Sequence, residues 1–152
     1  VFVDADSGVT SALLAGALKA LSDGAIGGVG KVKLCGRPTF FETSMVGVLN
    51  FCFRLAKIAP GCFIFCKKEA FLHVGGFDET LFVAEDVAIS RALGLRGAFA
   101  MLHEHVLTSD RKMRTHGAGA HFALMRQVLK RGGQVFRDKK DLDLWYGERR
   151  DP

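Results

Sequence analysis

The chain has 152 residues, which is enough for one domain with a hydrophobic core. Hydrophobic residues make up 49% and charged residues 24%, a balance that excludes a disordered or fibrous protein. The net charge of +5 suits an anionic partner, but no basic motif is interleaved with aromatic residues, so we expect no nucleic acid among the partners. Apolar runs also stay shorter than the roughly 20 residues of a membrane-spanning helix. We therefore expect a single domain over residues 1–152.

The spacing of apolar residues predicts alternating strands and helices along the chain. Strands are predicted at 1–3, which we expect to be buried, at 26–34, at 62–66 and at 98–102 with an extension to 107. Helices are predicted at 11–21 with Thr10 as N-cap, and at 42–57, 67–74, 85–95 and 118–131. This order predicts an α/β fold with a mixed sheet flanked by helices.

The helix predicted at 42–57 is strongly apolar and contains Met45, Leu49, Phe51 and Phe53. Helices of this kind most often cover a sheet, and we favour that interpretation here. The same pattern also fits contact with a membrane or with a protein partner.

The four cysteines stand among apolar neighbours; they are Cys35, Cys52, Cys62 and Cys66. Their spacings are not typical of a zinc site. We therefore expect buried, reduced thiols, which favours a cytoplasmic location.

Three segments carry the residue types of a catalytic site. Asp4 and Asp6 follow a predicted strand, and two carboxylates on a turn can share one divalent cation, Mn²⁺ or Mg²⁺. Glu85 and Asp86 open a predicted helix, where a carboxylate can act as general base toward a hydroxyl. The basic segment 111–117 suits a diphosphate or another anion. Each segment also has an ordinary structural interpretation: an acidic turn, the N-terminal capping of a helix and a basic surface loop.

The combination and order of these segments resembles glycosyltransferase family 2, whose members have the GT-A fold. A strand ending in a D-x-D motif is matched by Val1–Asp6, and a glycine-led strand with a short helix by Gly61–Lys68. Gly75–Glu79 matches the Gly-Gly-Phe-Asp-Glu segment directly. An acidic pair opening a helix is matched by Glu85–Arg91, and a Thr-Ser-x-Arg-Lys segment by Thr108–Lys112. The resemblance covers nearly the whole chain.

The resemblance implies roles for the four carboxylates. Asp6 is similar to the direct metal ligand of the family, and Asp4 to the residue near the ribose, the donor sugar or the metal's water shell. Asp86 is similar to the catalytic base that deprotonates the acceptor hydroxyl. Glu85 is similar to a residue that orients the acceptor or tunes that base.

Further site residues are implied with less detail. Many GT-A enzymes add a histidine to the metal; His103, His105 and His116 lie in the matching stretch, and we favour His116 because it stands in the basic segment. The residues expected to bind substrate are Gly61, Gly76, Arg111 and Arg114.

The activity implied is metal-dependent transfer of a sugar from a nucleotide-diphosphate sugar to an acceptor hydroxyl, with inversion at the anomeric carbon. The acceptor is expected to be a saccharide or a lipid-linked molecule. An apolar helix and a basic surface fit peripheral association with the inner face of the membrane.

Because the chain opens at the D-x-D strand, we expect a partial GT-A fold that lacks the N-terminal nucleotide-binding half. Such a fragment is expected to bind donor weakly. An exposed sheet edge would also favour a homo-oligomer.

Two other functions remain open from the sequence. Phosphatases of the haloacid dehalogenase type also begin with a D-x-D strand, in which the first Asp is the nucleophile. They require Gly-Thr directly after the second Asp, whereas Ser7–Thr10 carries these residues in a shifted pattern, and they have no Gly-Gly-Phe-Asp-Glu segment. The third hypothesis is a truncated, non-catalytic interaction module.

Overall fold

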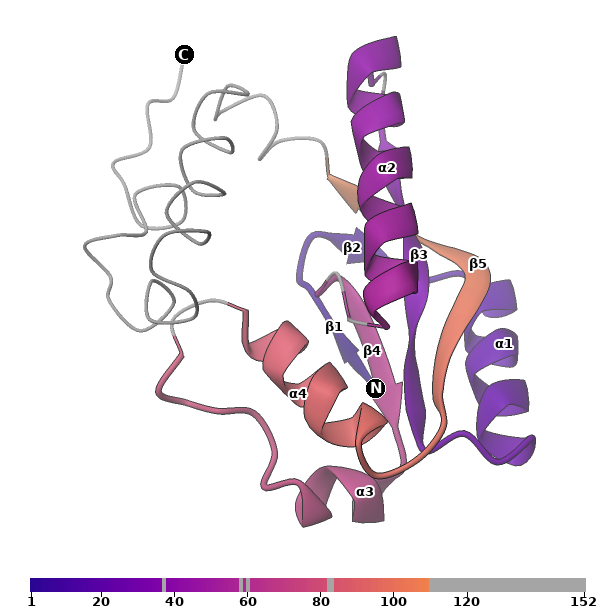
Figure 1. The fold of residues 1–152 in the computed structure, drawn as a ribbon. Helices are drawn as coiled ribbons and strands as arrows, with labels where there is room; N and C mark the ends of the chain where they lie inside the picture. The colour runs from indigo at the N-terminus through magenta and orange to yellow at the C-terminus, as the bar shows by residue number, and fades with distance from the viewer. Residues whose placement is uncertain (37, 58, 60, 82–83, 110–152) are drawn as a thin grey trace.

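The computed structural model describes residues 1–36, 38–57, 59, 61–81 and 84–109, which form an α/β fold with a five-stranded mixed sheet flanked by helices (Figure 1). The strands are β1 (Phe2–Val3), β2 (Ser7–Gly8), β3 (Gly27–Cys35), β4 (Phe63–Cys66) and β5 (Phe99–Ser109). The helices are α1 (Ser11–Ser22), α2 (Phe40–Ala56), α3 (Lys68–His73) and α4 (Glu85–Gly94). Every element predicted up to residue 107 is present, and β2 is an addition. The helix predicted at 118–131 lies outside the described residues.

The sheet has the strand order β1-β4-β3-β5-β2. β4 runs antiparallel to both of its neighbours, β1 and β3. β3 and β5 are parallel and form the longest pairing of the sheet, while β2 pairs antiparallel with β5. The expectation of a mixed sheet is therefore confirmed.

Helix α1 covers one face of the sheet because its inward residues are spaced four apart. Leu13 and Ala17 are buried and pack with Phe63 and Phe65 of β4. The Thr10 side chain accepts a hydrogen bond from the backbone N–H of Leu13 at 3.1 Å, which confirms the predicted N-cap.

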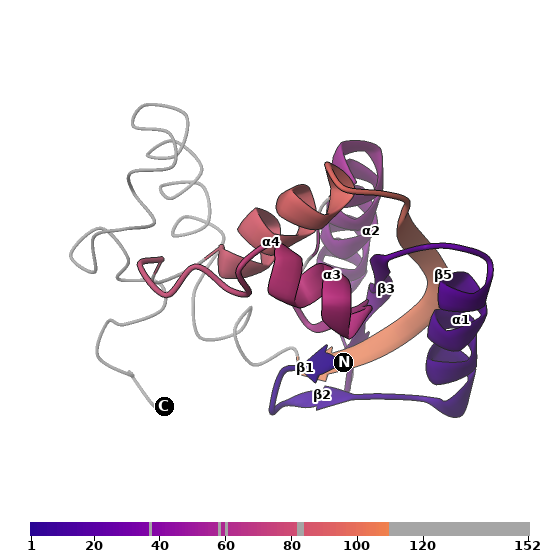
Figure 2. The same cartoon turned by 90° about the horizontal axis from the view of Figure 1, so that it is seen from below.

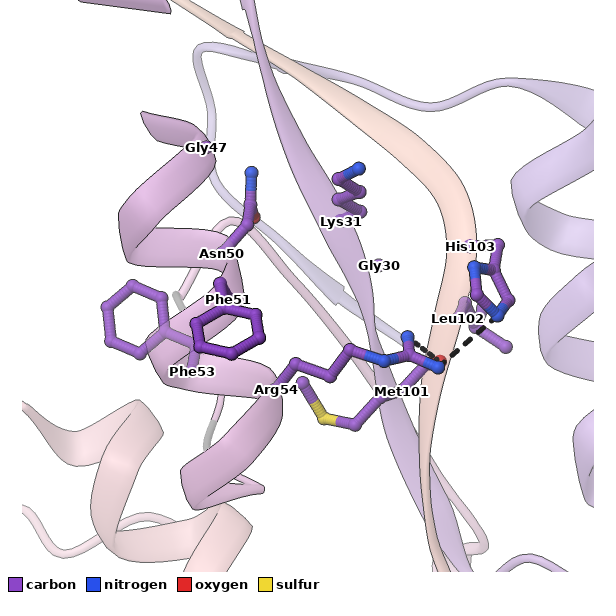
Figure 3. A pocket seen from close by; sticks show the side chains of 10 residues that line it. All are labelled: Gly30, Lys31, Gly47, Asn50, Phe51, Phe53, Arg54, Met101, Leu102 and His103. Carbon is purple, nitrogen blue, oxygen red and sulfur yellow. Dashed lines mark hydrogen bonds between the residues drawn. The ribbon is translucent and has the colours of Figure 1, made fainter. Parts of the chain in front are cut away.

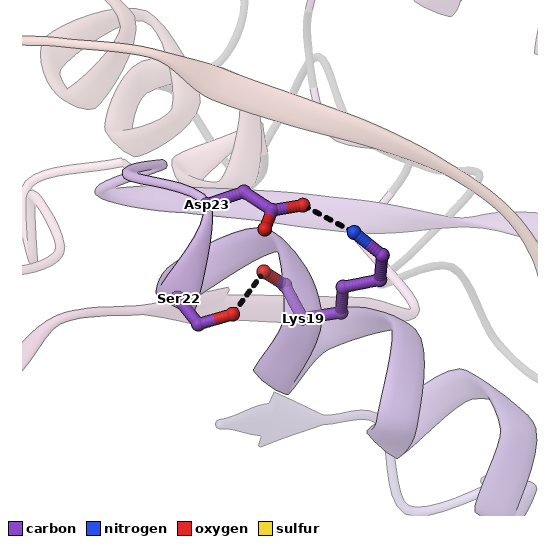
Figure 4. A network of polar contacts seen from close by, with 3 residues as sticks. All are labelled: Lys19, Ser22 and Asp23. Carbon is purple, nitrogen blue, oxygen red and sulfur yellow. Dashed lines mark hydrogen bonds and ion pairs between the residues drawn. The ribbon is translucent and has the colours of Figure 1, made fainter.

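The far end of α1 carries an exposed polar network (Figure 4). Lys19 Nζ lies 2.6 Å from Asp23 Oδ2, and the Ser22 hydroxyl donates to the Lys19 carbonyl at 2.8 Å. Because both charged groups face solvent, this pair contributes little to stability.

Helices α3 and α4 lie on the opposite face of the sheet from α1 (Figure 2). Successive side chains of a strand point to opposite faces, so Ile64 of β4 points away from Phe63 and Phe65. Ile89 and Leu93 of α4 are buried and pack with Ile64 on this second face.

Helix α2 begins at Phe40, two residues before its predicted start, and its N-cap Thr39 forms a capping box. Thr39 Oγ1 accepts from the Glu42 N–H, and the Thr39 N–H donates to Glu42 Oε2 at 2.6 Å. This reciprocal pair of hydrogen bonds gives partners to backbone N–H groups that have no acceptor within the first helical turn.

Asn50 of α2 takes the place of a neighbouring strand along β3. β4 pairs with β3 only as far as Val29, so no strand among the described residues lies beside the next part of that edge. Asn50 Oδ1 accepts from the Val32 N–H at 3.0 Å, and Asn50 Nδ2 donates to the Val32 carbonyl at 2.9 Å. One side-chain amide thus completes the backbone hydrogen bonding of a strand residue.

The first strand is not buried as predicted. Val1 is 67% exposed and Val3 42% exposed. Among the described strands, β1 is at the edge of the sheet and pairs with β4 alone. One side of this apolar segment therefore has no neighbouring strand in the described structure.

Two further expectations about burial are wrong. The apolar residues of α2 are mostly exposed rather than packed on the sheet, because a hollow whose lining includes Lys31 and Lys33 separates part of the helix from β3. The cysteines are free thiols, but Cys35 at the end of β3 and Cys52 on α2 are exposed, and Cys62 and Cys66 are only half-buried. None of the helices in the described part of the chain has both the length and the hydropathy to cross a membrane.

Replacing Asn50 tests whether its amide holds α2 to the sheet. Asn50→Ala leaves the Val32 N–H and carbonyl without this partner, so we expect the free energy of unfolding to fall by about 1–2 kcal/mol. Ser44→Ala is the matched control, because Ser44 is an exposed residue of the same helix. Urea denaturation followed by circular dichroism measures both variants, and equal stabilities would contradict this role for Asn50.

Candidate active site

The D-x-D segment forms a tight turn between β1 and β2. The Asp4 carbonyl accepts from the Ser7 N–H at 3.0 Å, and both Asp4 and Asp6 are exposed. The Asp4 N–H donates to the Cys62 carbonyl at 3.3 Å, which ties the turn to the residue before β4. Both residues are therefore exposed to solvent, while hydrogen bonds to Ser7 and Cys62 hold the backbone of the turn.

Gly61 allows the Asp86 carboxyl to approach this turn. Its φ of +87° lies in the region that favours glycine. A Cβ atom at this position would lie 2.7 Å from Asp86 Oδ2, closer than such atoms can approach. The start of α4 therefore packs directly against the backbone that precedes Cys62, whose carbonyl holds Asp4.

The position of Asp86 alters its acidity. Burial raises the pKa of its carboxyl from 3.8 to about 6, and the negative charges of Glu85 and Asp4 act in the same direction. The hydrogen bond that Asp86 Oδ1 accepts from the Val87 N–H at 2.8 Å opposes part of this shift. The influence of Asp4 shows that the structure brings together two carboxylates 82 positions apart in the sequence.

The Gly75–Glu79 segment holds the loop that leads to α4. Gly75 and Gly76 both have positive φ and end α3, and the Gly76 N–H donates to the Phe71 carbonyl at 3.0 Å. Phe77 then packs edge-on against Phe2 of β1, with ring centroids 4.8 Å apart. The loop is thereby fastened to the strand that carries the D-x-D turn.

Within this segment Asp78 and Gly76 have clear structural roles. Asp78 Oδ1 accepts from the Thr80 N–H at 3.0 Å and from Thr80 Oγ1 at 2.6 Å, which forms an Asx turn. A Cβ atom at Gly76 would lie 3.2 Å from the Phe71 ring, so glycine permits close packing there. The substrate contact expected of Gly76 stays a prediction.

Glu85 and Asp86 occupy the first turn of α4, as predicted, but neither is its N-cap. That position is Ala84, whose side chain cannot cap the helix and whose φ is +64°. A left-handed alanine costs about 1 kcal/mol or more. Glu85 is exposed, whereas Asp86 is turned inward toward Gly61, so the two carboxylates have different surroundings.

The metal hypothesis rests on Asp4 and Asp6 among the described residues. No group of three or more His, Cys, Asp or Glu side chains in that part of the chain is arranged to hold a metal ion. His103 and His105 lie on β5, and His103 is engaged with Arg54. The predicted residues Arg111, Arg114 and His116 lie outside the described residues.

Two features of the structure were missed by the sequence analysis. The Ser7 hydroxyl, directly after Asp6, is buried and has no hydrogen-bond partner in the described structure. Its position beside the D-x-D motif was the only signal in the sequence. Two adjoining hollows, of about 240 and 460 Å³, lie between α2 and strands β3 and β5 (Figure 3). Asp4, Asp6 and Asp86 line neither of them.

Gly61→Ala tests the contact between Gly61 and Asp86. The added methyl group must displace the Asp86 carboxyl toward solvent, so we expect the pKa of Asp86 to fall from about 6 toward its ordinary value of 3.8. Gly75→Ala imposes the same left-handed strain in open space and should leave that pKa unchanged. NMR titration of the Asp86 carboxyl measures both variants. An unchanged pKa in Gly61→Ala would show that the carboxyl does not depend on this contact.

Asp86 also makes stability depend on pH. Because the pKa of Asp86 is higher in the folded state, its contribution to the free energy of unfolding is fully present below pH 3.8. This contribution, about 2–3 kcal/mol, is lost as the pH rises through 6. Asp86→Asn is expected to be more stable than the wild type by this amount at pH 7 and equally stable at pH 3.5. Denaturation curves at the two pH values measure the difference. Asp23→Asn, which removes an exposed ion pair, should change stability little at either pH.

No protein-family model matches this sequence, and neither a curated protein nor a solved structure matches it significantly. The function is therefore inferred from the quoted motifs and from the geometry of the site around Asp4, Gly61 and Asp86.

Proposed function

We propose that the chain is part of a GT-A glycosyltransferase that transfers a sugar from a nucleotide-diphosphate donor to an acceptor hydroxyl. The observation that carries this proposal is the inward carboxyl of Asp86, packed against Gly61 and near Asp4. The resemblance of these three segments to glycosyltransferase family 2 supports the same assignment. A half-buried carboxylate beside an exposed carboxylate pair suits a reaction that needs both a proton acceptor and an anchor for a charged leaving group.

The D-x-D turn fits a divalent cation that is shared with a substrate. Asp4 and Asp6 supply hard oxygen ligands from an exposed turn, which is the ligand type that Mg²⁺ and Mn²⁺ prefer. Two carboxylates do not form a closed protein cage, so diphosphate oxygens and waters would complete the coordination. When bound, the cation would neutralise charge on the departing nucleoside diphosphate.

Asp86 has the acidity required of a general base near neutral pH. With a pKa of about 6, its carboxyl is mostly ionised at pH 7 yet binds a proton far more readily than an exposed aspartate. Glu85, exposed on the same helical turn, is placed to orient the acceptor and adds negative charge that keeps this pKa raised. The two adjacent carboxylates thus have separate roles.

The proposed step is a single displacement. The acceptor oxygen forms a bond to the anomeric carbon as the bond from that carbon to the diphosphate breaks. The acceptor proton passes to Asp86, and the nucleoside diphosphate leaves with the bonding electron pair. Attack from the side opposite the leaving group inverts the configuration at the anomeric carbon.

Calorimetry with uridine and guanosine diphosphate sugars, with and without Mn²⁺, tests the proposal. We expect Asp6→Ala to abolish metal-dependent donor binding. Asp86→Asn should bind donor as the wild type does while sugar transfer falls by about a thousandfold. Asp23→Ala is the control, because Asp23 is an exposed aspartate at the far end of α1.

The outcomes separate the competing functions. Metal-dependent release of phosphate from an aryl phosphate would favour a phosphatase with Asp4 as nucleophile. Absence of heat with every donor sugar would favour the non-catalytic module. Full transfer activity in Asp86→Asn would remove Asp86 as the base while leaving the donor site intact.

A further inference from the structure

Helix α2 presents an unusually apolar surface to solvent. We define the apolar face of α2 as its exposed large hydrophobic residues Phe40, Phe41, Val48, Phe51 and Leu55, which are between 62% and 89% exposed. Their spacing of three, four and seven residues places them on one side of the helix. The other exposed residues on that side are Ser44 and Cys52, so the face carries no charge. Exposed apolar patches of this kind mark surfaces that bind something.

The surroundings of this face are basic. Arg54 and Lys57 lie at the C-terminal end of α2, and both are exposed. Lys31 and Lys33 are exposed on β3 beside the helix, where they line the hollows next to it. Figure 3 shows Lys31 in the smaller hollow. The acidic residue of α2 is Glu42, whose carboxylate is engaged in the capping box.

One of these four basic residues, Arg54, is held in place by contacts with β5. Arg54 Nη1 donates to the Met101 carbonyl at 3.0 Å, and Nη2 lies 3.2 Å from His103 Nε2. These contacts fix Arg54 between α2 and β5 while its guanidinium stays exposed. Asn50 fixes the helix to β3, so the apolar face cannot rotate toward the sheet without losing both Asn50 hydrogen bonds.

The charges decide between a lipid surface and a second copy of the chain. In a symmetric dimer through α2, the same patch of both copies meets, and this patch offers the flanking cations no free anionic partner, because the carboxylate of Glu42 is engaged in the capping box. An anionic lipid surface instead offers hydrocarbon to the phenylalanines and negative headgroups to the flanking cations.

We propose that α2 docks this protein onto an anionic membrane surface, with its apolar face in the headgroup–acyl boundary and with Lys31, Lys33, Arg54 and Lys57 among the lipid headgroups. The helix lies in the plane of the interface and does not cross the bilayer. This docking does not depend on sugar transfer, so it can be tested without donor or acceptor.

Co-sedimentation of the full chain with vesicles tests the docking. We expect binding to vesicles of phosphatidylcholine mixed with phosphatidylglycerol, weaker by about tenfold on phosphatidylcholine alone and reduced by added salt. The double variant Phe51→Ser and Leu55→Ser should lower the partition coefficient by about tenfold or more. Leu18→Ser is the matched control, because Leu18 is 68% exposed on α1, on the opposite face of the sheet.

A second measurement guards against a variant that fails to fold. Phe51→Trp keeps an aromatic residue at an exposed position. The wild-type signal from Trp145 is subtracted, and lipids brominated on the acyl chain should quench the fluorescence that remains. Leu18→Trp should not be quenched. Failure of the full chain to bind anionic vesicles would overturn the proposal, as would equal quenching of the two tryptophans. Concentration-dependent dimers that disappear in the double variant would assign the face to a second copy instead.

Discussion

The rest of the structure depends on the short, buried strand β4. It pairs with β1 on one side and β3 on the other, and its side chains enter both hydrophobic cores. Phe63 and Phe65 pack toward α1, whereas Ile64 packs toward α4. Gly61 and Cys62 come directly before β4, so the strand also places the backbone to which Asp4 and Asp86 are held. Burial of Phe63, Ile64 and Phe65 thus positions the candidate site.

The site illustrates how packing changes the chemistry of an ordinary carboxylate. Moving a charged group away from water is unfavourable, so Asp86 binds its proton more tightly than an exposed aspartate does. Asp4 and Asp6 keep their solvent contact because their turn lies at the edge of the sheet. The carboxyl of Asp86 and those of Asp4 and Asp6 therefore differ in exposure and in how tightly they bind a proton, and the difference between them is environmental.

The short length of β4 has a second consequence on the other side of the sheet. Where β4 ends, β3 continues beyond its neighbour, and Asn50 supplies the hydrogen bonds that another strand would have made. The helix is then joined to the sheet by polar contacts along a strand that carries lysines. None of its apolar residues belongs to either of the two hydrophobic clusters among the described residues. This is why a sequence pattern typical of a sheet-covering helix forms an exposed surface here.

Local patterns in the sequence determined most elements: Thr10 and the Leu13–Ala17 spacing define α1, and paired glycines after residue 74 end α3. They also singled out Asp4, Asp6 and Asp86, because hard carboxylates at a strand end and a helix start are recognisable without a structure. Only the tertiary structure decided which of these residues meet and how deeply each is buried, since those facts depend on strand neighbours distant in the chain. The edge position of β1 and the exposure of the apolar face of α2 follow from the order of the strands in the sheet. Local sequence patterns do not determine that order.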